Sequence, residues 1–232
     1  LKELAQVMKK NGAKAIVQIH HGGAQALPEL TPDGDVVAPS AISLKSFGQQ
    51  KEHDAREMTA EEIEQTIRDF GEATRRAIEA GFDGVEIHGA NHYLIHQFVS
   101  PYYNRRNDVW ADNYKFPVAV IDEVVKAKKA HANDDFIIGY RLSPEEAESP
   151  GISMEITEEL IHQIANKPLD YIHVSLMDVN SVTREGKYKG ENRLKLIHQW
   201  INGRMPLIGI GSVFTAEDAL NAVENIGVEF VA

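Results

Sequence analysis

The sequence predicts an α/β protein with the fold of a TIM (β/α)8 barrel, and three observations favour this prediction. Stretches with helical apolar spacing alternate with short, apolar, β-rich runs, as in a repeated strand–helix unit. Histidine, asparagine and arginine follow several of these runs, at the strand ends where such barrels display reacting groups. No Gly-x-Gly-x-x-Gly turn follows the first run, although a doubly wound nucleotide-binding sheet would need one.

The predicted elements follow one another in a regular order. Residues 1–11 form an amphipathic helix that ends near Gly12, because glycine suits the left-handed residue after a helix end. A strand at 14–19 precedes a long polar loop. Thr59, followed by acidic residues, caps a helix that ends at Gly81. The remaining strands are 85–88, 136–141, 171–175, 206–210 and 228–232, and the remaining helices are 113–131, 157–166, 191–202 and 215–225.

Strands that are each followed by a helix should be parallel and buried, because every return crossover covers one face of the sheet. The pattern yields two strands fewer than an eight-stranded barrel needs to close. We therefore expect residues 1–232 to form a single barrel domain that is a fragment of a longer chain. The first two strands and the end of the last unit would lie outside it.

Composition excludes several classes of protein. The 43% hydrophobic and 25% charged residues are typical of a globular chain, and no apolar stretch approaches the length of a membrane span. The net charge of −11 argues against nucleic acid or an anionic membrane as partner. The chain has no cysteine, which excludes disulfides and cysteine-bound metal within it. With no signal segment at the first residues, we expect a cytoplasmic protein.

The segment 84–101 carries the strongest functional signal. A short β-branched run breaks there into imidazole, amide and phenol groups, with His88, Asn91 and Tyr93 at the junction. The C-terminal end of a barrel strand is where catalytic side chains are displayed. From spacing alone, an equally good interpretation is that His88 only ends the strand and that Tyr93 packs in the core.

The chain resembles the old yellow enzyme family, whose members are flavin-dependent ene-reductases, also called NADH:flavin oxidoreductases. The most specific segment is residues 81–108, which is similar to the family's signature loop after its fourth strand. Weaker matches occur in the family's order along nearly the whole chain. They are residues 17–23, 56–59, 139–143, 170–175 and 206–212.

The resemblance implies a reaction and its cofactors. The family passes a hydride from NAD(P)H through FMN to an activated C=C bond, in an α,β-unsaturated carbonyl or a nitro compound. Such a reduction needs hydrogen-bond donors on the activating oxygen and a proton source for the second carbon. His88 and Asn91 match the family's donors, and Tyr93 matches its proton donor. The expected partner is therefore a small enone-type acceptor.

The resemblance also assigns flavin contacts. Gln18 matches a glutamine that hydrogen-bonds the pyrimidine edge, and Arg141 matches the cation beside the reduced ring. Gly209 and Gly211 match the backbone cradle of the FMN phosphate. Arg141 could instead form a salt bridge with Glu145 or Glu86, and Gln18 could be only a polar residue near a strand end.

The sequence departs from the family pattern in three places. His92 stands where the family often has glycine, and residues 109–114 replace a glycine-rich stretch. The family's second phosphate-binding pair, Gly-Arg, would begin where the sequence ends at Ala232. The conformation of these loops and the completeness of an FMN site are therefore open at this point.

Two other functions compete with this prediction. In a metal-dependent hydrolase, imidazoles at strand ends would hold the ion, although no His-x-His pair stands on a strand and we expect no metal site. The chain could also be a non-catalytic barrel remnant with exposed strand edges. A homo-oligomer is compatible with each of these functions. The histidines that would serve the metal alternative are His20, His21, His88, His92, His96 and His173.

Overall fold

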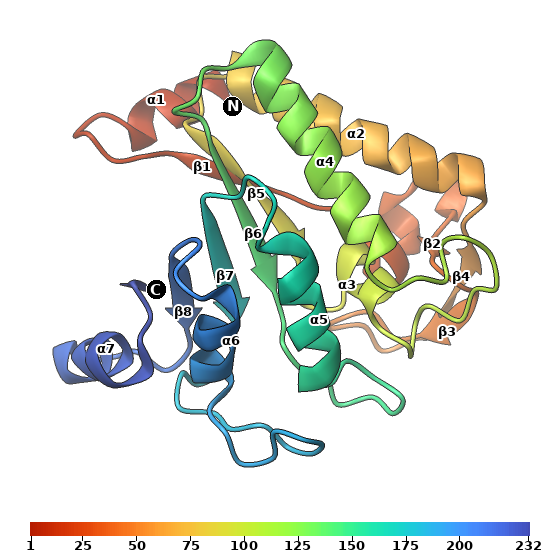
Figure 1. Cartoon of the computed structure of the whole chain (residues 1–232). Coiled ribbons are helices and arrows are strands. Elements are labelled where there is room, and N and C mark those ends of the chain that lie inside the picture. The colour runs from red at the N-terminus through yellow and green to blue at the C-terminus, as the bar shows by residue number, and fades with distance from the viewer.

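A six-stranded parallel sheet organises the molecule, and the computed structural model describes all of residues 1–232 (Figure 1). Neighbouring strands in the sheet follow one another in sequence order, and every pair is parallel. The predicted parallel arrangement is confirmed. The strands are β1 (Ile16–Ile19), β5 (Gly84–Gly89), β6 (Ile137–Leu142), β7 (Tyr171–Ser175), β8 (Leu207–Ile210) and β9 (Phe230–Val231).

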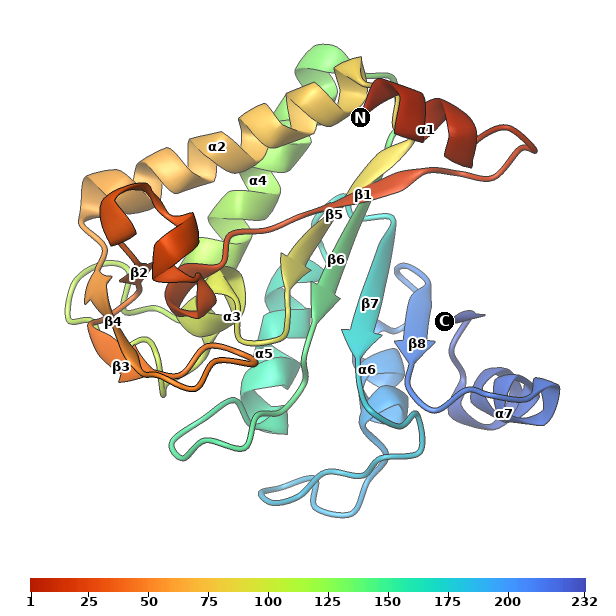
Figure 2. The same cartoon turned by 180° about the vertical axis from the view of Figure 1, so that it is seen from behind.

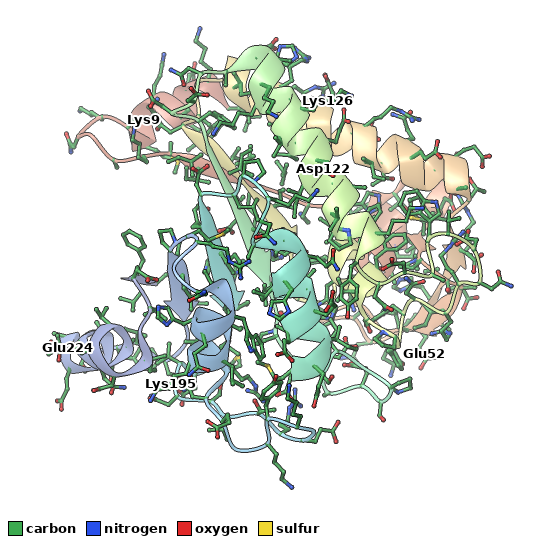
Figure 3. All side chains as sticks on the ribbon, viewed as in Figure 1. Lys9, Glu52, Asp122, Lys126, Lys195 and Glu224 are labelled. Atoms are coloured by element: carbon green, nitrogen blue, oxygen red, sulfur yellow. The ribbon has the colours of Figure 1, made fainter.

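Helices connect these strands and cover one face of the sheet. Figure 1 shows α4, α5 and α6 in front of the strands, and Figure 2 looks onto the opposite face of β5, β6 and β7. Charged side chains such as Lys126 and Glu224 project from the outer surface (Figure 3). The helices are α1 (Lys2–Met8), α2 (Ala60–Glu79), α3 (Leu94–Val99), α4 (Lys115–His131), α5 (Met154–Ile164), α6 (Arg193–Ile201) and α7 (Ala216–Asn221).

Alternation along each strand separates the core from the site. On β5, Val85 and Ile87 are fully buried and belong to the main hydrophobic cluster of 42 buried residues. Glu86 and His88 alternate with them in sequence and therefore point to the other face. Polar residues on that face form hydrogen bonds between strands. Each strand therefore has one row of alternate residues that packs under the helices, and a second row that faces the other side of the sheet and is largely polar.

The predicted cap of α2 is confirmed. Glu62 N–H donates to Thr59 Oγ1 at 3.2 Å, and Thr59 N–H donates back to the Glu62 carboxylate at 2.8 Å. This reciprocal pair satisfies two backbone donors that the first helical turn leaves free. Thr74, which interrupted the predicted apolar stripe, is fully buried and donates to Phe70 O at 2.9 Å.

Removing the cap should destabilise the protein modestly. We expect Thr59→Ala to lower the free energy of unfolding by about 1 kcal/mol, because the N–H of Glu62 loses its acceptor. Urea unfolding followed by circular dichroism measures the change. Ser43→Ala, at an exposed serine of a strand, is the control and should change stability by less than about 0.5 kcal/mol. An equal effect of both variants would contradict the capping role.

The long loop before Thr59 is not wholly irregular, which corrects the prediction. It contains a small sheet in the order β2-β4-β3, from β2 (Val37–Ala38), β3 (Ile42–Leu44) and β4 (His53–Glu57). It also contains short 3-10 turns, at Gly23–Gln25, Pro28–Leu30 and Pro32–Gly34. These strands have only two to five residues, which is too short for a period-two pattern to mark all of them in the sequence.

Several predicted boundaries also need correction. The helix at 1–11 ends at Met8, the helix at 157–166 begins at Met154, and the last strand has two residues in place of 228–232. The helix at 215–225 is α7 followed by a π-helical turn, Ala222–Ile226. No helix of the structure is both long and apolar enough to cross a membrane.

Candidate active site

The C-terminal ends of neighbouring strands bring most of the predicted site residues together. In the sheet register, Gln18 pairs with Glu86, and His88 pairs with Arg141. An open cavity of about 430 Å³ lies at this end. Four of the predicted site residues line it, so residues from two strands and one loop meet there. Its lining is Gln18, His20, Phe47, His88, Asn91 and Tyr93.

His88 ends β5 as a buried, neutral imidazole. Its residue is 4% exposed, and its Nδ1 atom has no hydrogen-bond partner. Burial, followed by repulsion from the protonated form of His20 and from Arg141, lowers the pKa of His88 to about 4. Near neutral pH the ring therefore carries one N–H, which it can donate, and one free acceptor nitrogen. Its centroid lies 5.2 Å from the Tyr93 ring.

The turn that carries Asn91 and Tyr93 is held in an unusual conformation. Asn91 and His92 both have positive φ angles, of 57° and 59°, which costs free energy in residues other than glycine. Three contacts hold this turn. Asn91 N–H donates to Ser143 Oγ at 3.0 Å, Leu94 N–H donates to His21 O at 3.0 Å, and Gln97 Nε2 donates to His92 O at 2.6 Å.

These contacts place the Asn91 amide and the Tyr93 ring at the cavity. Asn91 Nδ2 donates to Ser175 Oγ at 3.3 Å, which leaves its second hydrogen free for a ligand. Tyr93 stands at the start of α3, with its ring centroid 5.0 Å from that of His20. His92, at the position often held by glycine, does not line the cavity, and its ring centroid lies 4.6 Å from that of His96.

Arg141 makes neither of the salt bridges considered from the sequence. Its Nη2 donates to Ser175 Oγ at 3.0 Å, and its buried Nε has no partner. Glu145 instead pairs with Arg193 at 2.5 Å, and Glu86 binds His173 at 2.9 Å. A guanidinium without a carboxylate partner at a strand end is suited to an anionic ligand.

Gly209 and Gly211 do not line this cavity. A Cβ on Gly209 would meet Val228 and Leu194 at 3.0 and 3.1 Å, so this glycine permits close packing on the core side of β8. Gly211 has a φ of 131°, and a Cβ there would meet backbone atoms of residues 176–178 within 2.7 Å. Both glycines thus have a packing reason, and their predicted phosphate contact stays a prediction.

Several residues of the site were missed in the sequence. Ser143 and Ser175 hold Asn91, and Phe47 covers one side of the cavity from the irregular loop. Glu86 and His173 lie on the polar face beside Gln18 and Arg141. The alternation of Tyr171, His173 and Ser175 along one strand could have indicated the serine and the histidine. No local signal marks Phe47.

The histidines proposed for a metal are divided among separate places. His20 and His88 face the cavity, while His173 binds Glu86. His92, His96 and Glu146 do approach, with potential ligand atoms within 4.8 Å of one another. Glu146, however, already accepts from His96 Nε2, the Ser100 hydroxyl and the Ile152 N–H. The Glu146 carboxylate is therefore satisfied by hydrogen bonds, whereas Nδ1 of His92 and Nδ1 of His96 have no hydrogen-bond partner.

The low pKa of His88 predicts a pH-dependent stability. Between the ordinary histidine pKa of 6.5 and about 4, the unfolded chain binds a proton that folded His88 excludes. The free energy of unfolding should therefore rise with pH across this window, and fall on acidification by at most about 3 kcal/mol for this residue.

Urea unfolding at several pH values between about 4 and 7 tests this expectation. Stability of His88→Asn should depend less steeply on pH than stability of the unmutated protein. His131→Asn, at an exposed histidine of α4, is the matched control. Identical pH slopes for the His88 variant and the unmutated protein would show that His88 is not held neutral by burial.

A comparison with protein families decides what kind of protein this is. The model described as the NADH:flavin oxidoreductase / NADH oxidase family matches residues 1–232. The chain belongs to this family. The resemblance inferred from segment 81–108 is thereby confirmed, and flavin and nicotinamide are the cofactors of the family. The metal-dependent alternative is not favoured.

Relatives within the NADH:flavin oxidoreductase family agree. The chain is 51% identical over 236 residues to a probable NADH-dependent flavin oxidoreductase, YqiG, of Bacillus subtilis (strain 168), covering 100% of the chain and 62% of that protein. It is 41% identical over 231 residues to an NADH:acrylate oxidoreductase of Vibrio harveyi, covering 97% of the chain and 23% of that protein. The chain thus spans less than two thirds of either relative.

Solved structures confirm the barrel fold. Morphinone reductase in complex with tetrahydroNAD superposes with a TM-score of 0.79 at 24% identity, covering 100% of the chain and 64% of that protein. Histamine dehydrogenase from Rhizobium sp. 4-9 gives a TM-score of 0.80 at 22% identity, over 100% of the chain and 34% of that protein. The six parallel strands are therefore part of a TIM barrel, as the sequence predicted.

The residues present fit the family's flavin. Buried polar atoms without partners, Arg141 Nε and His173 Nε2, lie on neighbouring strands of the polar face. Gln18 lines the cavity beside them. A flavin ring offers an edge of carbonyl oxygens and an N–H group, which suits one cationic and one amide side chain. Arg141 and Gln18 are thus the residues that would hold it.

Proposed function

We propose that the protein reduces activated C=C bonds with electrons from NAD(P)H, using FMN bound by the domain that residues 1–232 form. The observation that supports this most is the meeting of His88, Asn91 and Tyr93 at one cavity with Gln18. When bound, FMN supplies the hydride that it has taken from the nicotinamide. The protein supplies orientation, hydrogen-bond donors and a proton.

His88 and Asn91 hold the activating oxygen of the acceptor. Neutral His88 has one N–H, and the Asn91 amide has one hydrogen beyond that engaged with Ser175. Two donors aimed at one carbonyl or nitro oxygen stabilise the negative charge that develops there as the alkene is reduced. The fixed turn at Asn91 keeps this arrangement in place before the acceptor arrives.

Tyr93 gives the proton to the second carbon. The centroid of its ring lies 5.0 Å from that of His20 and 5.2 Å from that of His88. The acceptor class is an α,β-unsaturated carbonyl or nitro compound. Two relatives are named NADH:acrylate oxidoreductase and NADH:fumarate oxidoreductase. Acrylate and fumarate each have a C=C bond conjugated to a carboxyl group, which agrees with an electron-poor alkene as acceptor.

An absorbance spectrum of the purified full-length protein tests the proposal. We expect flavin bands, and a long-wavelength charge-transfer band when a phenol is added, because a phenolate can occupy the site of the acceptor oxygen beside His88 and Asn91. His88→Ala should weaken phenol binding, and His131→Ala, at an exposed position, should not. A colourless protein that FMN cannot reconstitute would contradict the proposed function.

The location and assembly of the protein belong to the same proposal. Dependence on a reduced nicotinamide, which cells keep inside, supports a cytoplasmic location. The assembly to be tested is a homo-oligomer. Light scattering after gel filtration tests whether one forms.

A further inference from the structure

Glu86 lies at the centre of a hydrogen-bond network on the polar face of the sheet. The residue is 7% exposed, and its carboxylate accepts from three side chains on two other strands. Gln18 Nε2 donates at 2.6 Å, His173 Nδ1 at 2.9 Å and Tyr171 Oη at 3.0 Å. Glu86 does not line the cavity and takes no part in the proposed reaction steps.

The sequence makes room for this network. Gly139 stands between Glu86 and Tyr171 in the sheet register. A Cβ on Gly139 would meet Tyr171 Cζ at 2.0 Å, so only glycine lets the tyrosine ring cross β6 to reach the carboxylate on β5. Burial and the Glu86 carboxylate raise the pKa of Tyr171, so its hydroxyl keeps the proton that it donates to Glu86.

Glu86 is ionised in the folded protein. Burial acts to raise the pKa of its carboxyl, but the hydrogen bond and charge of His173, with the bonds from Gln18 and Tyr171, bring it below its ordinary value. An ionised carboxylate has acceptor atoms only. Each of its three partners must therefore turn a donor towards it.

This requirement fixes the direction of the Gln18 amide. A glutamine amide has a donor end and an acceptor end of nearly equal size, so a polar pocket usually tolerates either orientation. With Nε2 bound to Glu86, the carbonyl oxygen of Gln18 is the end left for a ligand, and Gln18 lines the cavity. By the same rule, His173 holds its proton on Nδ1.

We propose that Glu86 is a positioning residue that orients the Gln18 amide, so that its carbonyl oxygen accepts from the N3–H group of the flavin pyrimidine ring. The role rests on the proposed function, since it concerns how FMN is held. A flipped amide would present N–H to N–H and lose that bond. Glu86 thus acts through Gln18 and does not touch the cofactor.

Glu86→Gln tests the role, because it keeps the shape and removes the acceptor-only property. The new amide can donate to Gln18, so both orientations of Gln18 become accessible. We expect the Kd for FMN, measured by flavin fluorescence, to rise about tenfold, as for one lost hydrogen bond. In 15N-labelled FMN bound to the variant, the N3 resonance should move towards that of an N3–H without an acceptor.

Glu145→Gln is the matched control. It removes a carboxylate whose side chain is 4% exposed and which binds Arg193, outside the cavity lining. We expect it to leave both the Kd for FMN and the N3 resonance unchanged. Equal changes in the two variants would assign the effect to loss of a buried charge and overturn the positioning role.

Two measurements on the unmutated protein cover the case that Glu86→Gln fails to fold. The 15N resonances of His173, assigned with His173→Gln, should show the proton on Nδ1, and N3 of bound FMN should show an accepted hydrogen bond. A His173 ring without a proton on Nδ1, or an N3–H without an acceptor, would overturn the role. Failure of the unmutated protein to bind FMN would overturn the proposed function itself, which is a separate result.

Discussion

Tyr93→Phe should slow alkene reduction by about 10²- to 10⁴-fold while flavin reduction by NAD(P)H keeps its rate. The substitution removes only the hydroxyl that gives the proton. The ring remains beside those of His20 and His88, so the shape of the cavity is kept. Stopped-flow absorbance of the flavin measures the two half-reactions separately.

Tyr188→Phe is a suitable control for this experiment. Tyr188 lies next to Trp200, with ring centroids 5.2 Å apart, and it does not line the cavity. We expect both half-reactions of that variant to match the unmutated protein. Equal loss in the two half-reactions of Tyr93→Phe would exclude Tyr93 as the proton donor and indicate damage to flavin binding.

Glu146→Gln should destabilise the fold by about 3 kcal/mol. The Glu146 side chain is fully buried and accepts from His96 Nε2 at 2.7 Å and Ile152 N–H at 2.8 Å, as well as from the Ser100 hydroxyl. A glutamine has only one acceptor oxygen, so at least one of these donors would be left without a partner and the new NH2 would face donors.

Urea unfolding measures this loss. Glu159→Gln, at an exposed residue of α5 that accepts only from Gln163, should change the free energy of unfolding by less than about 0.5 kcal/mol. Glu146→Gln should also weaken phenol binding, since His92 Nδ1 lies 3.6 Å from the carboxylate and His92 forms half of the left-handed turn. A variant as stable as the control would contradict the network.

Much of the fold could be predicted from periodicity, and the failures have physical reasons. The capped helix from Thr59 and the parallel strands follow from local signals that the structure keeps. Helix α3 was not predicted, because all six of its residues are buried and the sequence therefore shows no alternation of an apolar and a polar face. The strand β4, with sequence His-Asp-Ala-Arg-Glu, was not predicted, because it is mostly exposed and has only one apolar residue.

The meeting of His88, Asn91 and Tyr93 at one cavity could be predicted from the signature segment, and the residues that support them could not. His88, Asn91 and Tyr93 lie in one continuous stretch, so their closeness is visible in the sequence. Glu86 could be suspected of pairing with Arg141, but the register sets it against Gln18 and brings His173 to it. Contacts between strands tens of residues apart depend on register, which a single sequence does not display.

The division of each strand into a helix-facing row and a cavity-facing row has a consequence for how this protein can change its acceptor. His20, His88 and Tyr93 meet mainly through their rings at the open cavity, while Val85 and Ile87 on the opposite row carry the packing. Substitutions of residues that face the cavity can therefore change the acceptor while lowering the free energy of unfolding less than substitutions in the buried, helix-facing row. A combinatorial library at His20, Phe47 and Tyr93 should consist mostly of folded proteins, and one at Val85 and Ile87 should not.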